Sequence, residues 1–123
     1  MRIVVCGSIK RNGELIERVG RYLRRQGHTV FTPRDVPFYP SITPEQKAED
    51  NKAYREAIKH CDAIYIVNNG YTGPSTYGEI AQAIIQGKKI YYFTKPNPDE
   101  LELLSYIYEG LAEVWQIPMG ELF

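Results

Sequence analysis

The chain has 123 residues, of which 43% are hydrophobic, and its 15 basic residues balance its 15 acidic residues. This length suits one domain, residues 1–123, and the apolar content excludes a disordered chain. A net charge of zero argues against binding a nucleic-acid polymer, because a surface that neutralises phosphates needs an excess of Lys and Arg.

No apolar run approaches the roughly 18 residues that a membrane helix needs. The first residues, Met1 to Val5, enter a strand-like segment without the pattern of a signal peptide. We therefore expect a cytoplasmic protein without membrane contact. Cys6 and Cys61 border apolar segments and are interpreted as small buried hydrophobic residues. No Cys/His group has zinc spacing, so no metal site is expected.

Short apolar runs alternate with amphipathic segments along the whole chain. The expected elements are, in order, strand Arg2–Cys6, helix Glu14–Gln26, strand His28–Thr32, helix Pro44–Lys59 capped by Thr43, strand Asp62–Asn68, a helix capped by Ser75 or Thr76 and ending at Gly87, strand Lys88–Thr94, helix Pro98–Glu109 and strand Ala112–Ile117. This alternation predicts an α/β fold: a single, doubly wound parallel sheet of the flavodoxin-like or Rossmann-like type, with strand order 2-1-3-4-5.

In that strand order the topological switch point lies between the first and third strands. The loops that follow these strands are Gly7–Gly13 and Asn69–Gly78, and a ligand is expected to bind there. Neither loop has the GxGxxG or GK[ST] pattern of nucleotide-cofactor and phosphate-loop proteins, and no cofactor is expected.

The first loop opens with Gly7-Ser8-Ile9. Glycine lets the backbone approach a ligand, and the Ser8 hydroxyl can donate to a phosphate or sugar oxygen. The alternative is a tight turn in which the Ser8 hydroxyl is already hydrogen-bonded. We take Gly7, Ser8 and Ile9 as candidate substrate-binding residues.

The second loop runs from Tyr71 to Gly78 and offers hydroxyls, glycines and aromatic rings. Ser75 and Thr76 lie where free N–H groups at a helix start can receive an anion, although the same hydroxyls can simply cap the helix. Tyr71 and Tyr77 can stack on a base or pack within the loop. The candidate substrate-binding residues here are Tyr71, Gly73, Ser75, Thr76 and Tyr77.

Glu79 follows this loop directly. It can be a nucleophile, a general base or only a favourable charge near a helix N-terminus, where the field keeps a carboxylate ionised. An ionised carboxylate beside a glycine-rich loop suits attack on an electrophilic sugar carbon. Residue chemistry alone leaves these three roles open.

The segment Pro33–Pro44 contains four prolines in twelve residues, which excludes a regular element. A loop of this length is often functional. Phe38 and Tyr39 within it are candidate lid residues that would close over a bound base. A purely structural excursion is the alternative.

Several motifs together resemble the nucleoside 2-deoxyribosyltransferase family, which includes nucleoside 5′-monophosphate N-glycosidases. They are Gly7-Ser8-Ile9, Cys61 to Val67, Gly73 to Ala83, and Gly87-Lys88-Lys89-Ile90. The resemblance extends over nearly the whole chain, and its best-matched part is the Ser/Thr-x-x-Gly-Glu segment followed by Gly-Lys.

The resemblance implies a nucleoside or nucleotide substrate and cleavage of its N-glycosidic bond. Glu79 matches the family's nucleophile, which forms a covalent glycosyl-enzyme. Ser8 and Ser75 are similar in position to groups that hold the 5′-phosphate in nucleotide-hydrolysing relatives. The family commonly builds its sites near subunit interfaces, which implies a homodimer or a larger homo-oligomer.

Two positions depart from the family pattern. Relatives place an Asp on the helix before the third strand, in the register that Tyr54 occupies here. Asp50 lies one turn upstream on the same helix face and is the candidate acid. Asp62 starts the third strand at the opposite edge of the sheet and is interpreted as structural. The loop Tyr71–Gly78 also lacks the acidic residue usual in transferases and has hydroxyls instead, which favours a phosphorylated substrate or a different sugar contact.

Three functions remain in competition. The first is an N-glycosidase or deoxyribosyltransferase that uses Glu79. The second is a non-catalytic nucleotide-binding or sensor module with the same pocket. The third is a structural or oligomerisation role in which the tail, Leu122-Phe123, packs on a partner.

Overall fold

The computed structural model describes residues 1–33, 43–97 and 112–123. The described residues form a five-stranded parallel sheet in the order β2-β1-β3-β4-β5. The strands are β1 (Arg2–Gly7), β2 (Thr29–Phe31), β3 (Ala63–Val67), β4 (Lys89–Tyr92) and β5 (Ala112–Val114). The predicted α/β fold and its strand order are thus confirmed. The predicted helix Pro98–Glu109 lies outside the described residues, as do Phe38 and Tyr39.

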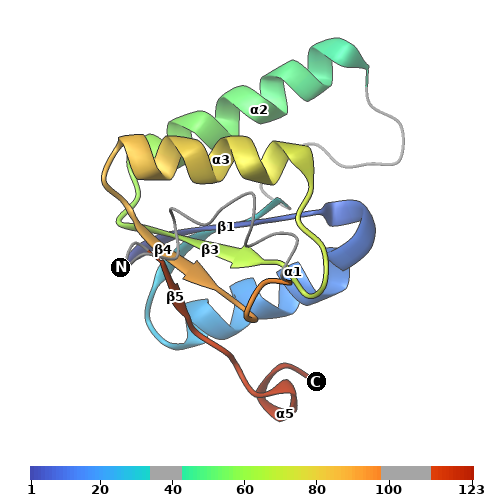
Figure 1. Cartoon of the computed structure of the whole chain (residues 1–123), viewed down its shortest axis with the longest axis vertical. Coiled ribbons are helices and arrows are strands. Elements are labelled where there is room, and N and C mark those ends of the chain that lie inside the picture. Colours follow the sequence, from blue (N-terminus) through green and yellow to red (C-terminus); the bar gives the residue numbers. More distant parts are fainter. Residues whose placement is uncertain (34–42, 98–111) are drawn as a thin grey trace.

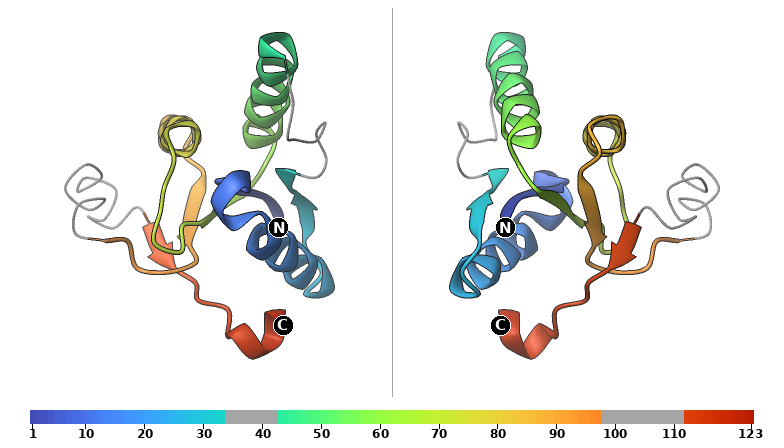
Figure 2. Two further views of the ribbon diagram at one scale, coloured as in Figure 1. Left: turned by 90° about the vertical axis from the view of Figure 1, so that its right-hand side faces the viewer. Right: turned by 90° about the vertical axis from the view of Figure 1, so that its left-hand side faces the viewer.

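Helices cover both faces of the sheet. The helices are α1 (Ile9–Arg25), α2 (Pro44–Lys59), α3 (Pro74–Ile85) and the short α5 (Met119–Leu122). α2 and α3 lie on one face, and α1 and α5 lie on the other (Figures 1 and 2). No described helix has the length and apolarity that crossing a bilayer requires.

The core divides into two clusters because successive residues of a strand point to opposite faces. In β1, Ile3 and Val5 pack under α1, whereas Val4 and Cys6 pack under α2 and α3. β3 is buried on both faces, as expected for a central parallel strand. Cys6 is therefore the last β1 side chain beneath α3 before the carboxyl edge of the sheet.

The first predicted loop is shorter than expected. Helix α1 begins at Ile9, not at Glu14, because Ser8 is its N-cap and its Oγ accepts from the Arg11 N–H at 3.3 Å. The helix tolerates a kink at Asn12 (φ −127°, ψ 20°). The buried Asn12 side chain donates there to the Val67 carbonyl at 3.4 Å. The Ser8 cap lets the helix start at Ile9, with a kink at Asn12, where the sequence predicts a loop.

The N-cap of α2 agrees with the prediction from the sequence, and the N-cap of α3 does not. Thr43 and Gln46 form the predicted capping box of α2. The N-cap of α3 is Gly73, followed by Pro74 in the first turn, and no side chain caps that helix. The prediction that Ser75 or Thr76 caps α3 is wrong, because Pro74 lets the helix start earlier.

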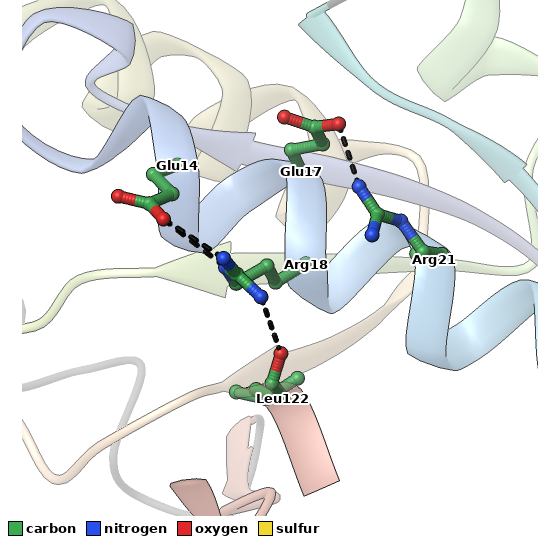
Figure 3. Close-up of polar contacts among 5 residues, drawn as sticks. All are labelled: Glu14, Glu17, Arg18, Arg21 and Leu122. Atoms are coloured by element: carbon green, nitrogen blue, oxygen red, sulfur yellow. Dashed lines mark hydrogen bonds and ion pairs between the residues drawn. The ribbon is translucent and has the colours of Figure 1, made fainter.

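The arginines of α1 form a solvated and internally paired helix face. Arg18 and Arg21 bind Glu14 and Glu17 one turn away, at 3.0 and 2.7 Å (Figure 3). Arg18 also donates to the Leu122 carbonyl at 3.0 Å. Arg18 and Arg21 thus have their charges matched by carboxylates of the same helix.

The C-terminal tail packs on its own chain. Leu122 is buried in the cluster beneath α1, and the Arg18 guanidinium lies 4.1 Å from the centre of the Phe123 ring. Phe123 itself remains 62% exposed. The hypothesis that Leu122 packs on a partner is wrong, because its side chain is already covered by α1 residues.

Gly20 allows α1 to lie close to the sheet. A Cβ added at Gly20 would lie 2.5 Å from Cγ2 of the buried Thr32. We expect Gly20→Ala to destabilise the protein by roughly 1–2 kcal/mol, because overpacking outweighs the gain in helix propensity. Gly13→Ala is the matched control, since its Cβ would meet only Ile9 Cγ2, at 3.7 Å. Urea unfolding of both variants tests this; equal stability of the two would contradict it.

Candidate active site

A cavity of about 650 Å³ opens at the carboxyl edge of the sheet, beside the switch point between β1 and β3. Its walls come from the β1–α1 turn, from α2 and from the loop and first turns of α3. The lining residues are Gly7, Ser8, Ile9, Lys10, Pro33, Lys47, Asp50, Asn51, Tyr54, Tyr71, Gly73, Pro74, Ser75, Thr76 and Glu79.

Most of the residues singled out in the sequence lie around this one cavity. They are Gly7, Ser8, Ile9, Asp50, Tyr71, Gly73, Ser75, Thr76 and Glu79. Tyr77 is the exception among the described candidates, because its side chain packs against the core cluster beneath α2 and α3. Asp62 lies at the opposite edge, where it accepts from the Arg2 N–H at 2.7 Å, as its structural interpretation predicts.

Gly7 is required where β1 meets the cavity. Its φ is +156°, and an added Cβ would lie 2.9 Å from the Val67 carbonyl oxygen. The absent side chain brings the end of β1 against the end of β3 and leaves room for the cavity above both strands.

Glu79 lies in the second turn of α3, counted from Pro74. Its Oε2 is buried and has no hydrogen-bond partner among the described residues. Burial raises the pKa of Glu79 to about 7, and a hydrogen bond from the Cys6 thiol offsets part of that effect. Desolvation by burial thus opposes the helix field that was expected to keep this carboxylate ionised.

Asp50 is the second buried acid of the cavity. It is 6% exposed, and neither carboxylate oxygen has a partner among the described residues. The other residues of α2 from Pro44 to Asn51 are exposed. A buried carboxylate without a partner is costly, and this one lies at the wall of the cavity.

Tyr54 occupies the register in which the family that the sequence resembles places its acid. Its hydroxyl lies 3.4 Å from the Val5 carbonyl oxygen, to which it donates. Its ring meets Phe31 edge-to-face, with 5.1 Å between the ring centres. The Tyr54 side chain thus packs between α2 and the sheet. Asp50 is the buried acidic residue of α2.

Two helices begin at the cavity. The residues Ser8-Ile9-Lys10 start α1, and Gly73-Pro74-Ser75 start α3. The free N–H groups and the positive dipole end of each helix favour an anion at this end of the cavity. Both helix starts come from loops that the sequence had selected.

Sequence reasoning missed several cavity residues. Lys10 and Lys47 bring positive charge to the lining. The Arg11 guanidinium stacks 4.1 Å from the centre of the Tyr71 ring and ties the two loops together at the cavity rim. Lys10 directly follows the Gly7-Ser8-Ile9 motif, so its position in the sequence could have predicted it as a cavity residue. Lys47 is one of several lysines on an exposed helix, and nothing in the sequence distinguishes it from the others.

A second opening of about 700 Å³ lies between α2 and α3 and shares Asn51, Tyr54, Ser75 and Glu79 with the first. Its other lining residues include Arg55, Glu56 and Lys59 of α2 and Gln82 of α3. Glu79 thus lies between the two openings, which share wall residues from both α2 and α3.

The same fold occurs in solved structures of nucleoside- and nucleotide-processing enzymes. One is a 2-deoxyribosyltransferase from the psychrotolerant bacterium Bacillus psychrosaccharolyticus, at 24% identity and a TM-score of 0.64, over 76% of this chain and 72% of that one. Another is the CMP N-glycosidase BcmB of Clostridium botulinum, at 24% identity and a TM-score of 0.61, over 95% of this chain and 87% of that one. No protein-family model matches the sequence, and no curated protein matches it. At this identity the likeness establishes the fold.

Proposed function

We propose that this protein cleaves or transfers at the N-glycosidic bond of a nucleoside or its 5′-monophosphate, with Glu79 as nucleophile. One observation carries the proposal: the Glu79 and Asp50 carboxylates line one cavity, each with a buried oxygen that has no hydrogen-bond partner among the described residues. The fold shared with a 2-deoxyribosyltransferase and a CMP N-glycosidase supports the same class of reaction.

In the proposed first step, the ionised Glu79 carboxylate attacks the anomeric carbon of the sugar. The C–N bond breaks as the C–O bond forms, and the base leaves with the electron pair. The Asp50 carboxyl group supplies a proton to the leaving base. The product is a covalent glycosyl ester of Glu79 and a free base.

In the second step, water or another base attacks the anomeric carbon and displaces Glu79. The attacking group loses its proton to Asp50, which returns both acids to their starting state. A pKa of about 7 for Glu79 lies close to neutral pH, so a large share of the enzyme holds the nucleophile in the attacking form.

The anion-binding end of the cavity supports a 5′-phosphate on the substrate. Ser8 and Ser75 offer hydroxyls beside the starts of α1 and α3, and Lys10 adds a positive charge. The loop before α3 carries no acidic side chain that would repel a phosphate. Three expectations from the sequence stay predictions: a lid formed by Phe38 and Tyr39, a homodimer or larger homo-oligomer, and a cytoplasmic location.

Chromatographic detection of free base tests the proposal. The protein is incubated with panels of ribo- and deoxyribonucleosides and their 5′-monophosphates, with and without a second free base. We expect base release, faster from the 5′-monophosphates than from the nucleosides. A new nucleoside formed only when the second base is present would identify a transferase, and release without it a hydrolase.

The alternative is a nucleotide-binding or sensor module without turnover, which the replacement of the family's acid by Tyr54 favours. Thermal shifts measured with the same panels separate the two functions. Binding of a nucleotide without release of any base would contradict the catalytic proposal and support the alternative.

A further inference from the structure

A side-chain contact at the rim of the cavity joins the two loops that border it. The Arg11 guanidinium lies 4.1 Å from the centre of the Tyr71 ring, which is the geometry of a cation–π contact. Arg11 belongs to the first turn of α1, and Tyr71 belongs to the loop between β3 and α3. The contact therefore links the starts of the two helices whose N-terminal residues line the cavity.

The first turn of α1 is set off from the rest of the helix by a kink. Asn12 has non-helical dihedral angles (φ −127°, ψ 20°), so residues 9–11 do not share the regular axis of the helix that follows. Two consecutive residues instead connect this turn to the β3 side of the cavity. The Asn12 side chain donates to the Val67 carbonyl at 3.4 Å, and the Arg11 side chain stacks on Tyr71.

The loop that carries Tyr71 also leads into a helix without a side-chain cap. α3 begins at Pro74 with Gly73 as its N-cap, and Gly70, just before Tyr71, has a φ of +84°. The Tyr71 ring lies close to the start of α3, since a Cβ added at Gly73 would lie 3.5 Å from its Cε1. Tyr71 thus has Arg11 of α1 as one neighbour and the N-cap of α3 as another.

Arg11 differs from the arginines farther along α1. Arg18 and Arg21 pair with Glu14 and Glu17. No carboxylate in the described part of the chain forms an ion pair with Arg11. Among the described residues, Tyr71 is therefore the partner that fixes the Arg11 guanidinium.

We propose that Arg11 is a positioning residue, whose stack on Tyr71 fixes the spacing of the two helix starts that receive the 5′-phosphate of the substrate. This inference rests on the proposed function. Ser8 and Lys10 lie just before Arg11 in the chain, and both line the cavity. Ser75 lies a few residues after Tyr71 and lines it too. Holding these groups in place before the ligand arrives reduces the ordering that binding has to supply.

The stack should therefore matter for a 5′-monophosphate and not for a nucleoside, which has no phosphate to place between the helix starts. Calorimetry measures the dissociation constants of the 5′-monophosphate that binds best in the panel, of its nucleoside and of inorganic phosphate. All variants carry Glu79→Gln, so that the proposed turnover does not consume the ligand. Thermal unfolding checks that each variant folds.

Four variants separate the stack from the charge. They are Arg11→Ala, Tyr71→Leu, the two combined, and Arg11→Lys, which keeps a cation that can stack. Arg21→Ala is the matched control, because it removes the same charge from α1 at a residue outside the lining of the cavity.

We expect Arg11→Ala to weaken binding of the 5′-monophosphate by about 2- to 5-fold, the size of an exposed cation–π contact. Tyr71→Leu should weaken it by a similar factor, although it changes no charge. Because both substitutions break the same contact, the double variant should bind no more weakly than the weaker single variant. Arg11→Lys should stay within about twofold of the parent. Arg21→Ala should not change the affinity, and Arg11→Ala should bind the nucleoside as the parent does.

NMR checks the contact directly, because the Tyr71 ring current displaces the Arg11 side-chain signals and Tyr71→Leu removes that displacement. Arg11 signals without the displacement would overturn the inference. An equal loss of affinity for nucleoside and 5′-monophosphate in Arg11→Ala would also overturn it, since the whole cavity would then have changed. Effects that multiply in the double variant would mean that Arg11 and Tyr71 act separately, and this too would overturn it.

Base-release assays on the wild-type protein keep this inference separate from the proposed reaction. A selective loss of 5′-monophosphate affinity in Arg11→Ala, in a protein that releases no base from any substrate, would support the stack and refute the catalytic function. Base release from nucleosides by a protein that binds neither a 5′-monophosphate nor inorganic phosphate would support catalysis and overturn the inference.

Discussion

Glu79→Gln is expected to lower base release by roughly three orders of magnitude or more. The amide keeps the size of the side chain and its place in α3, but it cannot form the glycosyl ester. Loss of a covalent nucleophile in other enzymes costs up to about 10⁶-fold in kcat. Binding of the nucleotide should persist, because the anion-binding residues are unchanged.

The measurement is single-turnover base release together with intact-mass detection of a glycosyl adduct, which should form in wild type and be absent in Glu79→Gln. Glu14→Gln is the control, since Glu14 lies on α1 away from the cavity, is 70% exposed and pairs with Arg18. It should keep the wild-type rate. Turnover by Glu79→Gln within tenfold of wild type would place the nucleophile elsewhere.

Glu79→Gln is also expected to stabilise the protein at alkaline pH. The pKa of Glu79 is raised from 4.5 to about 7, so the folded state holds this proton more tightly than the unfolded state. The stability contributed by the protonated form is complete below about pH 4.5 and is lost as pH rises through about 7. Ionising the buried carboxylate then costs at most about 3 kcal/mol.

Urea unfolding of wild type and Glu79→Gln at pH 5 and pH 8 measures this difference, and the comparison cancels the effects of other carboxylates. The advantage of Glu79→Gln should be small at pH 5 and larger at pH 8. Glu14→Gln should show no such trend, because an exposed i,i+4 pair is worth only a few tenths of a kcal/mol. A pH-independent difference for Glu79→Gln would mean that its carboxylate titrates normally.

The regular elements were predictable because each depends on local patterns. The Thr43–Gln46 capping box and the alternation of apolar runs predicted α2 and the sheet order, both of which the structure confirms. The errors arose where neighbours in space overrule the local pattern. Helix α1 starts at Ile9, within the predicted loop, and at its kink the Asn12 side chain donates to the Val67 carbonyl of β3.

The candidate site was predictable in position and less so in chemistry. Parallel strands bring their carboxyl ends to one edge, so the loops around Ser8 and Ser75 had to meet there. That Lys10 and Lys47 line the cavity could not be predicted, because it depends on how α1 and α2 run around the cavity. The burial of Asp50 could not be predicted either, because the residues next to it on α2 are polar and exposed.

The sequence by itself determined the α/β fold and its strand order, and it singled out the sheet edge and the carboxylate, Glu79, on which the proposed function rests. Only the tertiary structure decided the state of that acid. Its pKa depends on burial and on a thiol from β1, a strand far from α3 in the chain. Desolvation and hydrogen bonding act through space, so no pattern of neighbouring residues encodes them.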